Sequence, residues 1–425
     1  MKKALVPELR FPEFRDAGEW TIAPLKKLAS RRPERNCDGA LTRVLTNSAE
    51  RGIVNQRDYF DKDIATQGKL ENYLIVDMGD YVYNPRISTF APVGPISKNS
   101  VAKGVMSPLY TVFRFNNPDN EFYAHYFKSS AWHSYMRQVG STGARHDRMA
   151  ISNVDFMALP LPVAVPEEQQ KIADCLSSLD ALITAHTQKH EALKAHKKGL
   201  MQQLFPAEGE TVPTLRFPEF RVAGEWEEIK LGNVTNFLSG GTPSKDRPEY
   251  WEGNIPWISA SSMHDTRIDS SDQNITQLAV DEGARIAPKG TLLLLVRGSM
   301  LHKRIPVGIA ENNVAFNQDV KALDLKINIH EKFLLCLLVS NEPRLLGAVT
   351  KTGIGAGKLD TNDLNNFLVC MPNKKEEQQK IADLLSSIDE LITGQGQKIE
   401  SLKTHKKGLM QQLFPAMDVK TEADA

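Results

Sequence analysis

The residues with the clearest potential for binding chemistry are basic side chains beside glycine or proline turns. In the first half of the chain they are Arg86, Lys98, Lys103, Arg145, His146 and Arg148, and in the second half Lys245, Arg247, Arg297, Lys303, Arg304, Lys351 and Lys358. Arginine and lysine match phosphate oxygens and the acceptor atoms of guanine, so these positions are candidates for contacts with DNA. A solvated turn is an equally ordinary place for each of them.

Residues that could catalyse a reaction do not form a convincing set. The segment Tyr83-Asn84-Pro85-Arg86 matches only part of the Asn-Pro-Pro-aromatic motif of amino-methyltransferases, and the chain contains no Pro-Pro dipeptide. The glycines before Lys358 lack the spacing of a phosphate-binding loop, and Leu359 stands where a hydroxyl would hold magnesium. We therefore expect neither a catalytic site nor a cofactor site on this chain.

The four cysteines are Cys37, Cys175, Cys336 and Cys370, and they form no Cys-x-x-Cys pair. This scatter favours neither a zinc site nor a disulfide framework, so we expect no metal and interpret the cysteines as small buried residues. No apolar run approaches the roughly 18 residues needed to cross a bilayer, and the first residues lack the apolar stretch of a signal peptide. We expect a cytoplasmic protein.

Composition is that of a globular protein, because 41% of the 425 residues are hydrophobic and 24% are charged. The net charge is zero, but residues 1–165 carry 22 basic and 17 acidic residues, whereas residues 207–374 carry 18 and 21. A nucleic-acid surface on the second half must therefore be a local patch.

An internal repeat organises the chain. The 40 residues from Glu167 to Pro206 recur at Glu376 to Pro415 with 31 identities, and LRFPEFRDAGEW, ending at Trp20, recurs as LRFPEFRVAGEW, ending at Trp226. Residues 29–140 and 235–350, which lie between the repeats, have little in common. A duplicated frame with divergent inserts indicates two domains that recognise different things.

Both copies of the long repeat predict a helix with a heptad seam. The apolar seam residues are Ile172, Leu176, Leu179, Ile183, Leu193, Leu200 and Leu204 in the first copy, and Ile381, Leu385, Ile388, Ile392, Ile399, Leu402, Leu409 and Leu413 in the second. Polar residues take the remaining seam positions: His186, His190, Lys197, Gln395 and Lys406. We expect the two lysines to keep their charges at the edge of the seam.

Two near-identical seams in one chain favour an intramolecular coiled coil over a helix packed on its own domain. A helix of this length spans roughly 58 Å at about 1.5 Å per residue, or about 17 base pairs, so the pair could act as a spacer along DNA. A twofold arrangement of the repeats requires the helices to be antiparallel. The amino-terminal segment then lies near the carboxy-terminal helix, in an almost circular organisation.

The predicted fold is mixed α/β, with two recognition domains separated by two long antiparallel coiled-coil helices in a pseudo-twofold tandem repeat. The first domain is assigned to residues 1–165, the central spacer helix to 166–206, the second domain to 207–374, the C-terminal spacer helix to 375–416, and a flexible tail to 417–425. Within the domains, the apolar pattern predicts a strand at 105–115 and helices at 122–137 and 331–340. Within the second domain, the aromatic loop at 237–259 is either pinned to the core by its tryptophans or presents Lys245 and Arg247 to phosphates.

The helical repeats, EEQQKIADLLSSIDELI with its KKGLMQQLF tail, together with the IPWIS segment and a Thr-Gly loop, resemble the specificity (S) subunits of type I restriction-modification systems. This resemblance implies a bipartite double-stranded DNA site with one half read by each domain, two methyltransferase (M) subunits, and restriction (R) subunits. S-adenosylmethionine, ATP and magnesium are then expected on those partners.

Two other functions remain open from the sequence. One is a coiled-coil assembly scaffold with weak or no DNA specificity, which the zero net charge favours and the divergence of the two domains disfavours. The other is a self-contained modification enzyme, which cofactor binding by the isolated chain would reveal.

Overall fold

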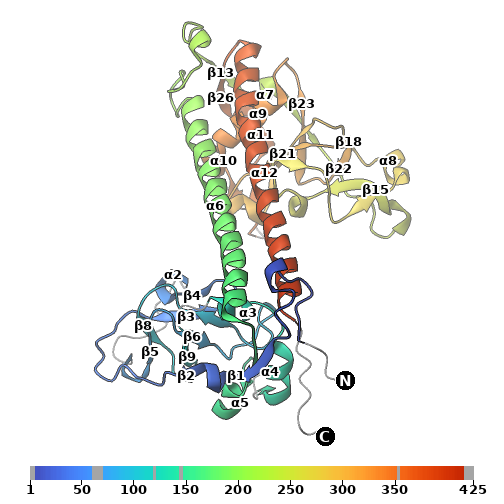
Figure 1. Cartoon of the computed structure of the whole chain (residues 1–425). Helices are drawn as coiled ribbons and strands as arrows, with labels where there is room; N and C mark the ends of the chain where they lie inside the picture. The colour runs from blue at the N-terminus through green and yellow to red at the C-terminus, as the bar shows by residue number, and fades with distance from the viewer. Residues whose placement is uncertain (1–4, 60–69, 118–120, 143–146, 352–354, 416–425) are drawn as a thin grey trace. The chain divides into compact units, whose positions relative to one another are not determined.

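The computed structural model describes residues 5–59, 70–117, 121–142, 147–351 and 355–415, which form two compact units (Figure 1). The first unit comprises Met1–His186 and Lys398–Ala425, and the second comprises Thr187–Gln397. Each unit holds a mixed α/β domain and one part of each long helix, which confirms the predicted fold class. The predicted tail at 417–425 lies outside the described residues.

The long helices are α6 (Pro166–Leu204, green in Figure 1) and α12 (Lys375–Leu413, red). Two glutamates occupy the first turn of each, where the helix dipole favours negative charge, and each helix ends just before a Phe-Pro pair that cannot continue it. Among the described residues, no helix is long and apolar enough to span a membrane.

Each of the fifteen predicted apolar seam residues is buried or half-buried. His186, His190, Lys197 and Gln395 are half-buried as well. The expectation for Lys406 at the edge of the seam was wrong, because this residue is buried, with an exposure of 7%. Asp180 lies beside it and neutralises its charge.

The two helices run in opposite directions within each unit, as predicted. In the first unit, Ile172 near the start of α6 shares a hydrophobic core with Leu413 at the end of α12. In the second unit, Leu204 at the end of α6 shares a core with Ile381 near the start of α12. The helix ends are therefore structural parts of both domains.

The repeated amino-terminal segments also pack as predicted. The backbone N–H of Leu9 donates to the Gln412 carbonyl oxygen at 3.1 Å in the first unit, and the N–H of Leu215 donates to the Gln203 carbonyl oxygen at 2.8 Å in the second. The start of the chain thus lies against its last long helix, as predicted for the amino-terminal segment.

A buried charge cluster fixes each of these segments to the start of a long helix. Glu168 accepts two hydrogen bonds from the Arg10 guanidinium, both at 2.7 Å, and one from the Trp20 indole at 3.0 Å. Glu377 binds Arg216 and Trp226 in the same way. Both glutamates are at most 1% exposed.

The first domain is built from short antiparallel strands around an aromatic core. Its central sheet has the order β2-β9-β6-β7, formed by Ala29–Arg31, Thr111–Phe115, Tyr81–Tyr83 and Ile96–Lys98. Three strand pairs flank it: β3 (Leu45–Ser48) with β4 (Gly52–Asn55), β5 (Leu74–Val76) with β8 (Gly104–Met106), and β10 (Ser141–Thr142) with β11 (Met149–Ala150). Its helices are α1 (Leu25–Leu28), α2 (Gln56–Tyr59), α3 (Phe122–Tyr126), α4 (His133–Val139) and α5 (Asn153–Met157).

The second domain has two larger sheets. One has the order β14-β23-β19-β21-β16, formed by Thr235–Ser239, Val320–Leu325, Leu292–Leu295, Val307–Ala310 and Arg267–Ile268. The other has the order β17-β15-β22-β18, formed by Asn274–Ile275, Trp251–Ile258, Val314–Phe316 and Ile286–Ala287. Strand β19 is a run of four leucines, all buried, as expected for a central strand covered on both faces.

Smaller elements complete both domains. Strand β1 (Thr21–Pro24) pairs with β12 (Pro160–Val163) in the first, and β13 (Glu227–Lys230) pairs with β26 (Leu368–Met371) in the second. A small sheet of order β20-β25-β24 is formed by Arg297–Gly298, Gly357–Lys358 and Thr350–Lys351. The helices of the second domain are α7 (Leu231–Val234), α8 (Gln277–Asp281), α9 (Glu331–Ser340), α10 (Glu342–Gly347) and α11 (Thr361–Asn366).

Candidate nucleic-acid interface

Two of the predicted basic residues of the first domain face one another across a β-bridge. Arg86 and Arg148 pair in antiparallel orientation, and both side chains are exposed. Backbone hydrogen bonds on either side fix the register, from Met149 N–H to the Pro85 oxygen at 2.9 Å and from Ile87 N–H to the Asp147 oxygen at 3.0 Å. Residues 62 positions apart in sequence are thereby held side by side.

The second domain repeats this pairing. Arg297 in β20 lies opposite Lys358 in β25, and both side chains are exposed. The Leu359 N–H donates to the Val296 oxygen at 2.8 Å, which matches the bond beside the first pair. The match is not complete, because Lys358 also forms an ion pair of 2.8 Å with Asp360.

Like charges directly opposite one another on neighbouring strands destabilise a sheet. Among the residues that the structure describes, no acidic side chain forms an ion pair with Arg86, Arg148 or Arg297. An anion bound between the two cations would relieve the repulsion, and a DNA phosphate is an anion that arginine binds well. The paired cations are therefore the strongest feature of the candidate interface.

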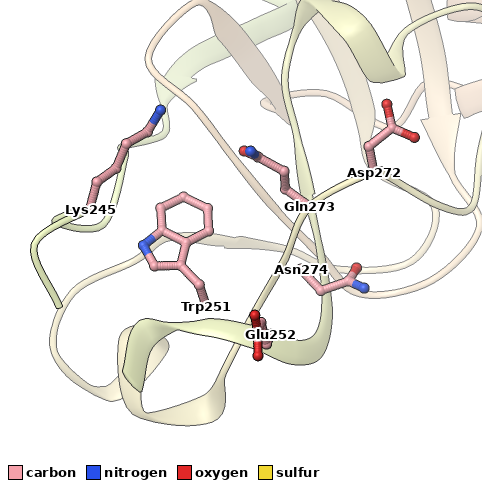
Figure 2. A pocket seen from close by; sticks show the side chains of 6 residues that line it. All are labelled: Lys245, Trp251, Glu252, Asp272, Gln273 and Asn274. Atoms are coloured by element: carbon pink, nitrogen blue, oxygen red, sulfur yellow. The ribbon is translucent and has the colours of Figure 1, made fainter. Parts of the chain in front are cut away.

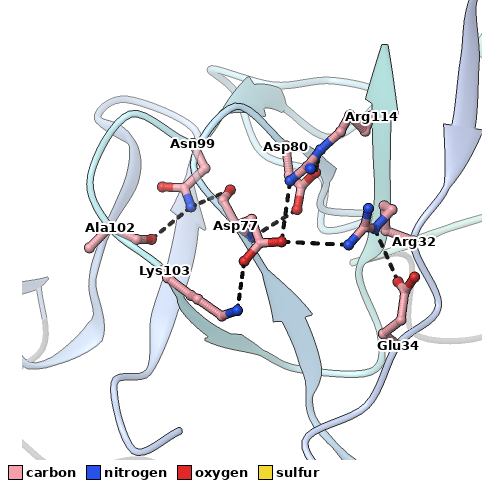
Figure 3. A network of polar contacts seen from close by, with 8 residues as sticks. All are labelled: Arg32, Glu34, Asp77, Asp80, Asn99, Ala102, Lys103 and Arg114. Atoms are coloured by element: carbon pink, nitrogen blue, oxygen red, sulfur yellow. Dashed lines mark hydrogen bonds and ion pairs between the residues drawn. The ribbon is translucent and has the colours of Figure 1, made fainter. Parts of the chain in front are cut away.

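Other predicted cations of the first domain are held by acidic residues. Lys98 pairs with Glu121 at 2.5 Å, and Lys103 pairs with Asp77 at 3.1 Å. Figure 3 shows Asp77 at the centre of a network that also binds Arg32 and Arg114. Burial works to raise the pKa of Asp77, but Lys103 and Arg114 outweigh it and bring this pKa below its ordinary value. The network keeps Lys103 neutralised in the free protein.

Two of the predicted cations in the second domain have structural partners. Arg247 forms ion pairs with Glu249 at 2.7 Å and Glu282 at 2.6 Å, and its guanidinium lies 4.1 Å from the ring centre of Tyr250. Arg304 donates to the backbone oxygens of Met263 at 2.8 Å and His264 at 3.0 Å. These contacts fasten loops of the domain together.

The remaining predicted cations differ in their surroundings. Lys303 and Lys351 are exposed, and Lys245 lines a surface pocket. Lys351 lies opposite Gly357, which precedes Lys358 on the same strand. Because successive side chains of a strand alternate between faces, Lys351 and Lys358 point to opposite faces of the small sheet. Arg145 and His146 lie outside the described residues.

Within the described ranges, no group of three or more His, Cys, Asp or Glu residues could hold a metal ion. The expectation that the cysteines are buried holds for Cys336 but is wrong for Cys37, which is exposed. Cys37 lies in a turn that begins at Asn36 and ends at Gly39. The backbone N–H of Gly39 donates to the Asn36 oxygen at 2.8 Å and closes this turn. Turns run over the surface, so a cysteine there is not drawn into the core.

Sequence reasoning missed the two buried glutamate clusters and the acidic partners of the cations. Arg10, Trp20 and Glu168 all recur at Arg216, Trp226 and Glu377, so the repeat itself carried a signal for the glutamate clusters. No comparable signal marked Asp77 or Glu282, which come from the divergent segments.

The chain matches known proteins along most of its length. The family model described as the type I restriction modification DNA specificity domain matches residues 49–195 and 223–404. The chain is 32% identical over 256 residues to the specificity subunit of the type I restriction enzyme EcoR124I/EcoR124II of Escherichia coli, covering 58% of this chain and 59% of that protein. It is 30% identical over 187 residues to the MjaIX specificity subunit of Methanocaldococcus jannaschii, covering 43% and 42%. These matches span less than two thirds of either relative.

Solved structures share the fold at low sequence identity. The type I restriction-modification S subunit from M. genitalium has a TM-score of 0.57 and 15% identity, covering 97% of this chain and 100% of that one. A chain from a study of assembly and conformational transition of the type I R-M system has a TM-score of 0.53 and 17% identity, covering 93% and 97%. Because the family model matches two segments that together make up well over half of the sequence, this chain belongs to the type I restriction modification DNA specificity family.

Proposed function

We propose that this chain is the DNA-reading subunit of a type I restriction-modification complex, and that each domain reads one half of a bipartite double-stranded target. The observation that carries the proposal is the like-charged pair at matching places in both domains, Arg86 with Arg148 and Arg297 with Lys358. In this role each pair holds a phosphate and sets the register of its domain on the duplex.

The residues around the two pairs differ between the domains, and these supply base recognition. The candidates for this role are Arg145 and His146, which neighbour Arg148 in the sequence, and Lys303 and Lys351 in the second domain, whereas Lys245 lines a separate surface pocket. Lys98, Lys103, Arg247 and Arg304 take part mainly by shaping the domains, because each already has a partner.

The long helices fix the unread gap between the half-sites and dock two methyltransferase subunits. One outward position supports this role, because it keeps the same apolar residue in both copies: Leu182 and Leu391 are 42% and 59% exposed at matching positions. Covering an exposed leucine with a partner protein lowers the free energy, because apolar surface is removed from water. The methyltransferase and restriction subunits carry out the catalysis with S-adenosylmethionine, ATP and magnesium. This chain has no catalytic role and binds no cofactor. The complex acts in the cytoplasm.

A coiled-coil scaffold with weak or no DNA specificity is the alternative. The ion-paired state of Lys98, Lys103 and Arg247 favours it, because these cations add little positive potential to the surface. The two like-charged pairs oppose it, since repulsion between exposed cations has no use in a pure scaffold.

The salt dependence of DNA binding tests the proposal. Binding of the full chain to sheared duplex DNA is measured between low and moderate salt for the wild type, for Arg86→Ala and for Arg148→Ala. Each lost phosphate contact flattens the slope of log K against log salt by about 0.9. Lys194→Ala, which removes an exposed lysine paired with Glu191 on α6, is the matched control. Identical slopes for all four proteins would exclude the pair from the interface.

A further inference from the structure

The second domain carries a surface pocket of about 470 Å³ away from the like-charged pair. Strand β15 and the loop before it supply Lys245, Trp251 and Glu252, and β17 with the segment before it supplies Asp272, Gln273 and Asn274. Figure 2 shows the indole of Trp251 between Lys245 and Gln273 in this view. A pocket of this size accommodates a single small planar group.

The aromatic wall of the pocket is held in place before any ligand binds. The Trp251 indole N–H donates to the Ser244 oxygen at 3.1 Å, and its ring packs edge to face on Trp257, with 5.4 Å between ring centres. Trp257 is itself fixed by a hydrogen bond of 3.1 Å to the Gly241 oxygen. Trp251 is half-buried, so part of its ring surface stays open to the pocket.

Glu252 lines the pocket in a strained conformation. It has a φ of +64°, and it is the one non-glycine residue with positive φ in the described part of the chain. Strand β15 bulges here, since Trp251 and Ile255 both pair with Ile275. The next residue must be glycine, because a Cβ on Gly253 would lie 2.1 Å from the Ile275 oxygen. Glycine would adopt this backbone conformation at position 252 without strain. The presence of a glutamate there instead indicates that its carboxylate has a function.

The polar groups around the pocket restrict what it can bind. Two carboxylates and one ammonium group leave the pocket with a net negative charge, which disfavours a phosphate inside it. The amides of Gln273 and Asn274 both donate and accept hydrogen bonds, which suits a base edge that alternates donor and acceptor, and a carboxylate accepts from an exocyclic amino group. Trp251 offers a face on which a base can stack.

We propose that this pocket binds one unpaired nucleobase that carries an exocyclic amino group, adenine or cytosine, stacked on Trp251. The base must leave the helix, because neighbouring base pairs cover both of its faces within a duplex. This inference rests on the proposed DNA-reading function and adds a contact outside the paired target.

Binding of 2-aminopurine deoxyriboside to the full chain tests the inference, because the fluorescence of this nucleoside falls when its base stacks. We expect saturable quenching that deoxyadenosine and deoxycytidine reverse, with thymidine about tenfold weaker because it lacks the amino group. Trp251→Ala weakens binding about tenfold or more. Gln273→Ala, at an exposed position, also weakens it. Phe90→Ala, at an aromatic side chain 72% exposed in the first unit, leaves binding unchanged.

Glu252→Gly separates recognition from structure. This variant relieves the backbone strain, so the protein unfolds no more easily, while the preference for amino-bearing nucleosides over thymidine is lost. Equal affinity for thymidine in the wild type would overturn the assigned base edge. Tighter binding of arginine amide than of any nucleoside would reassign the pocket to a cationic side chain. Absence of quenching together with retained binding to sheared duplex DNA would refute this inference alone, whereas loss of both would also refute the proposed function.

Discussion

The ammonium group of Lys406 lies 2.5 Å from Oδ1 of Asp180. The repeat places Lys197 and Asp389 at the matching positions, and they also pair, at 2.6 Å. The same contact is thus made once in each unit, with the helices exchanging the acidic and basic roles. The side chain of Lys406 is only 9% exposed, whereas that of Lys197 is 21% exposed, so the first pair is the more desolvated one.

Asp180→Asn is expected to destabilise the protein more than Asp389→Asn. The first change leaves the buried Lys406 ammonium without its carboxylate, at a cost of about 2 kcal/mol after allowance for the 41% exposure of Asp180. The second leaves a better solvated ammonium and costs about 1 kcal/mol. Urea unfolding followed by circular dichroism measures both, and equal losses would contradict the difference in burial.

The buried glutamates predict a large loss when one charge is removed. Glu168→Gln leaves the Arg10 guanidinium buried without a counter-charge, which costs about 3 kcal/mol. Glu377→Gln is expected to cost a similar amount, because Arg216 is held in the same way. Glu167→Gln, at the exposed neighbouring position, is the control in the same unfolding experiment. A loss below about 0.5 kcal/mol for Glu168→Gln would show that the cluster does not fix the segment.

Acid is expected to weaken the first unit through His125. Burial, with smaller effects of Lys128 and Lys406, lowers the pKa of His125 to about 4, although Asp180 opposes the shift. Between this value and the ordinary pKa of 6.5, the unfolded chain binds a proton that the folded chain does not. Stability therefore falls as pH drops through this range, by about 3 kcal/mol in total.

His125→Gln tests this pH dependence. The glutamine keeps a polar group near Ser177, whose Oγ lies 2.9 Å from His125 Nε2, and it removes the titration. Part of the dependence of the free energy of unfolding on pH remains in this variant, because burial also lowers the pKa of His133 to about 4. The free energy of unfolding is measured from pH 7 to pH 4, with His196→Gln at an exposed position as the control. An unchanged slope in His125→Gln would rule out this histidine as a source.

The like-charged pairs predict a conflict between stability and binding. Arg86→Glu turns repulsion with Arg148 into attraction, so it is expected to stabilise the free protein by about 0.5 kcal/mol while it weakens binding to duplex DNA. Arg297→Glu is expected to gain less, because Asp360 already neutralises Lys358. Thermal unfolding and DNA titration of the same samples measure the two effects. A gain in stability without a loss of affinity would remove the pair from the interface.

The length of the helices predicts the length of the unread gap. One heptad inserted in both α6 and α12 adds about 10 Å, equivalent to about three base pairs. The methylated motif is expected to gain this many unread positions, with both half-sites unchanged. Changed half-sites with the same gap would contradict the spacer role.

The long helices could be predicted because their signal is repeated and periodic, and helix α9 was predicted with its observed bounds, Glu331–Ser340. The stretch at 122–137 was wrongly predicted as one helix and forms α3 and α4. Side chains end α3, since the Ser129 hydroxyl donates to the Tyr126 oxygen at 2.7 Å and the Trp132 indole donates to the Phe127 oxygen at 3.1 Å. Such competition for helix carbonyls is not visible as periodicity.

The strand predicted at 105–115 is also two elements, β8 and β9. A turn separates them, in which Tyr110 N–H donates to the Ser107 oxygen at 3.0 Å around Pro108. The candidate nucleic-acid interface was also predictable only in part from the sequence. Composition marks cations near turns, but whether a cation faces another cation, as Arg86 does, or an acid, as Lys103 does, depends on long-range pairing.

The DNA-reading role is tested by mapping methylated adenines in genomic DNA after co-expression of this chain with its methyltransferase subunit. We expect a bipartite motif with a fixed gap, in which exchange of residues 29–150 changes one half-site and exchange of residues 235–360 changes the other. Methylation that stays the same after both exchanges would contradict it and would place sequence choice in the partner.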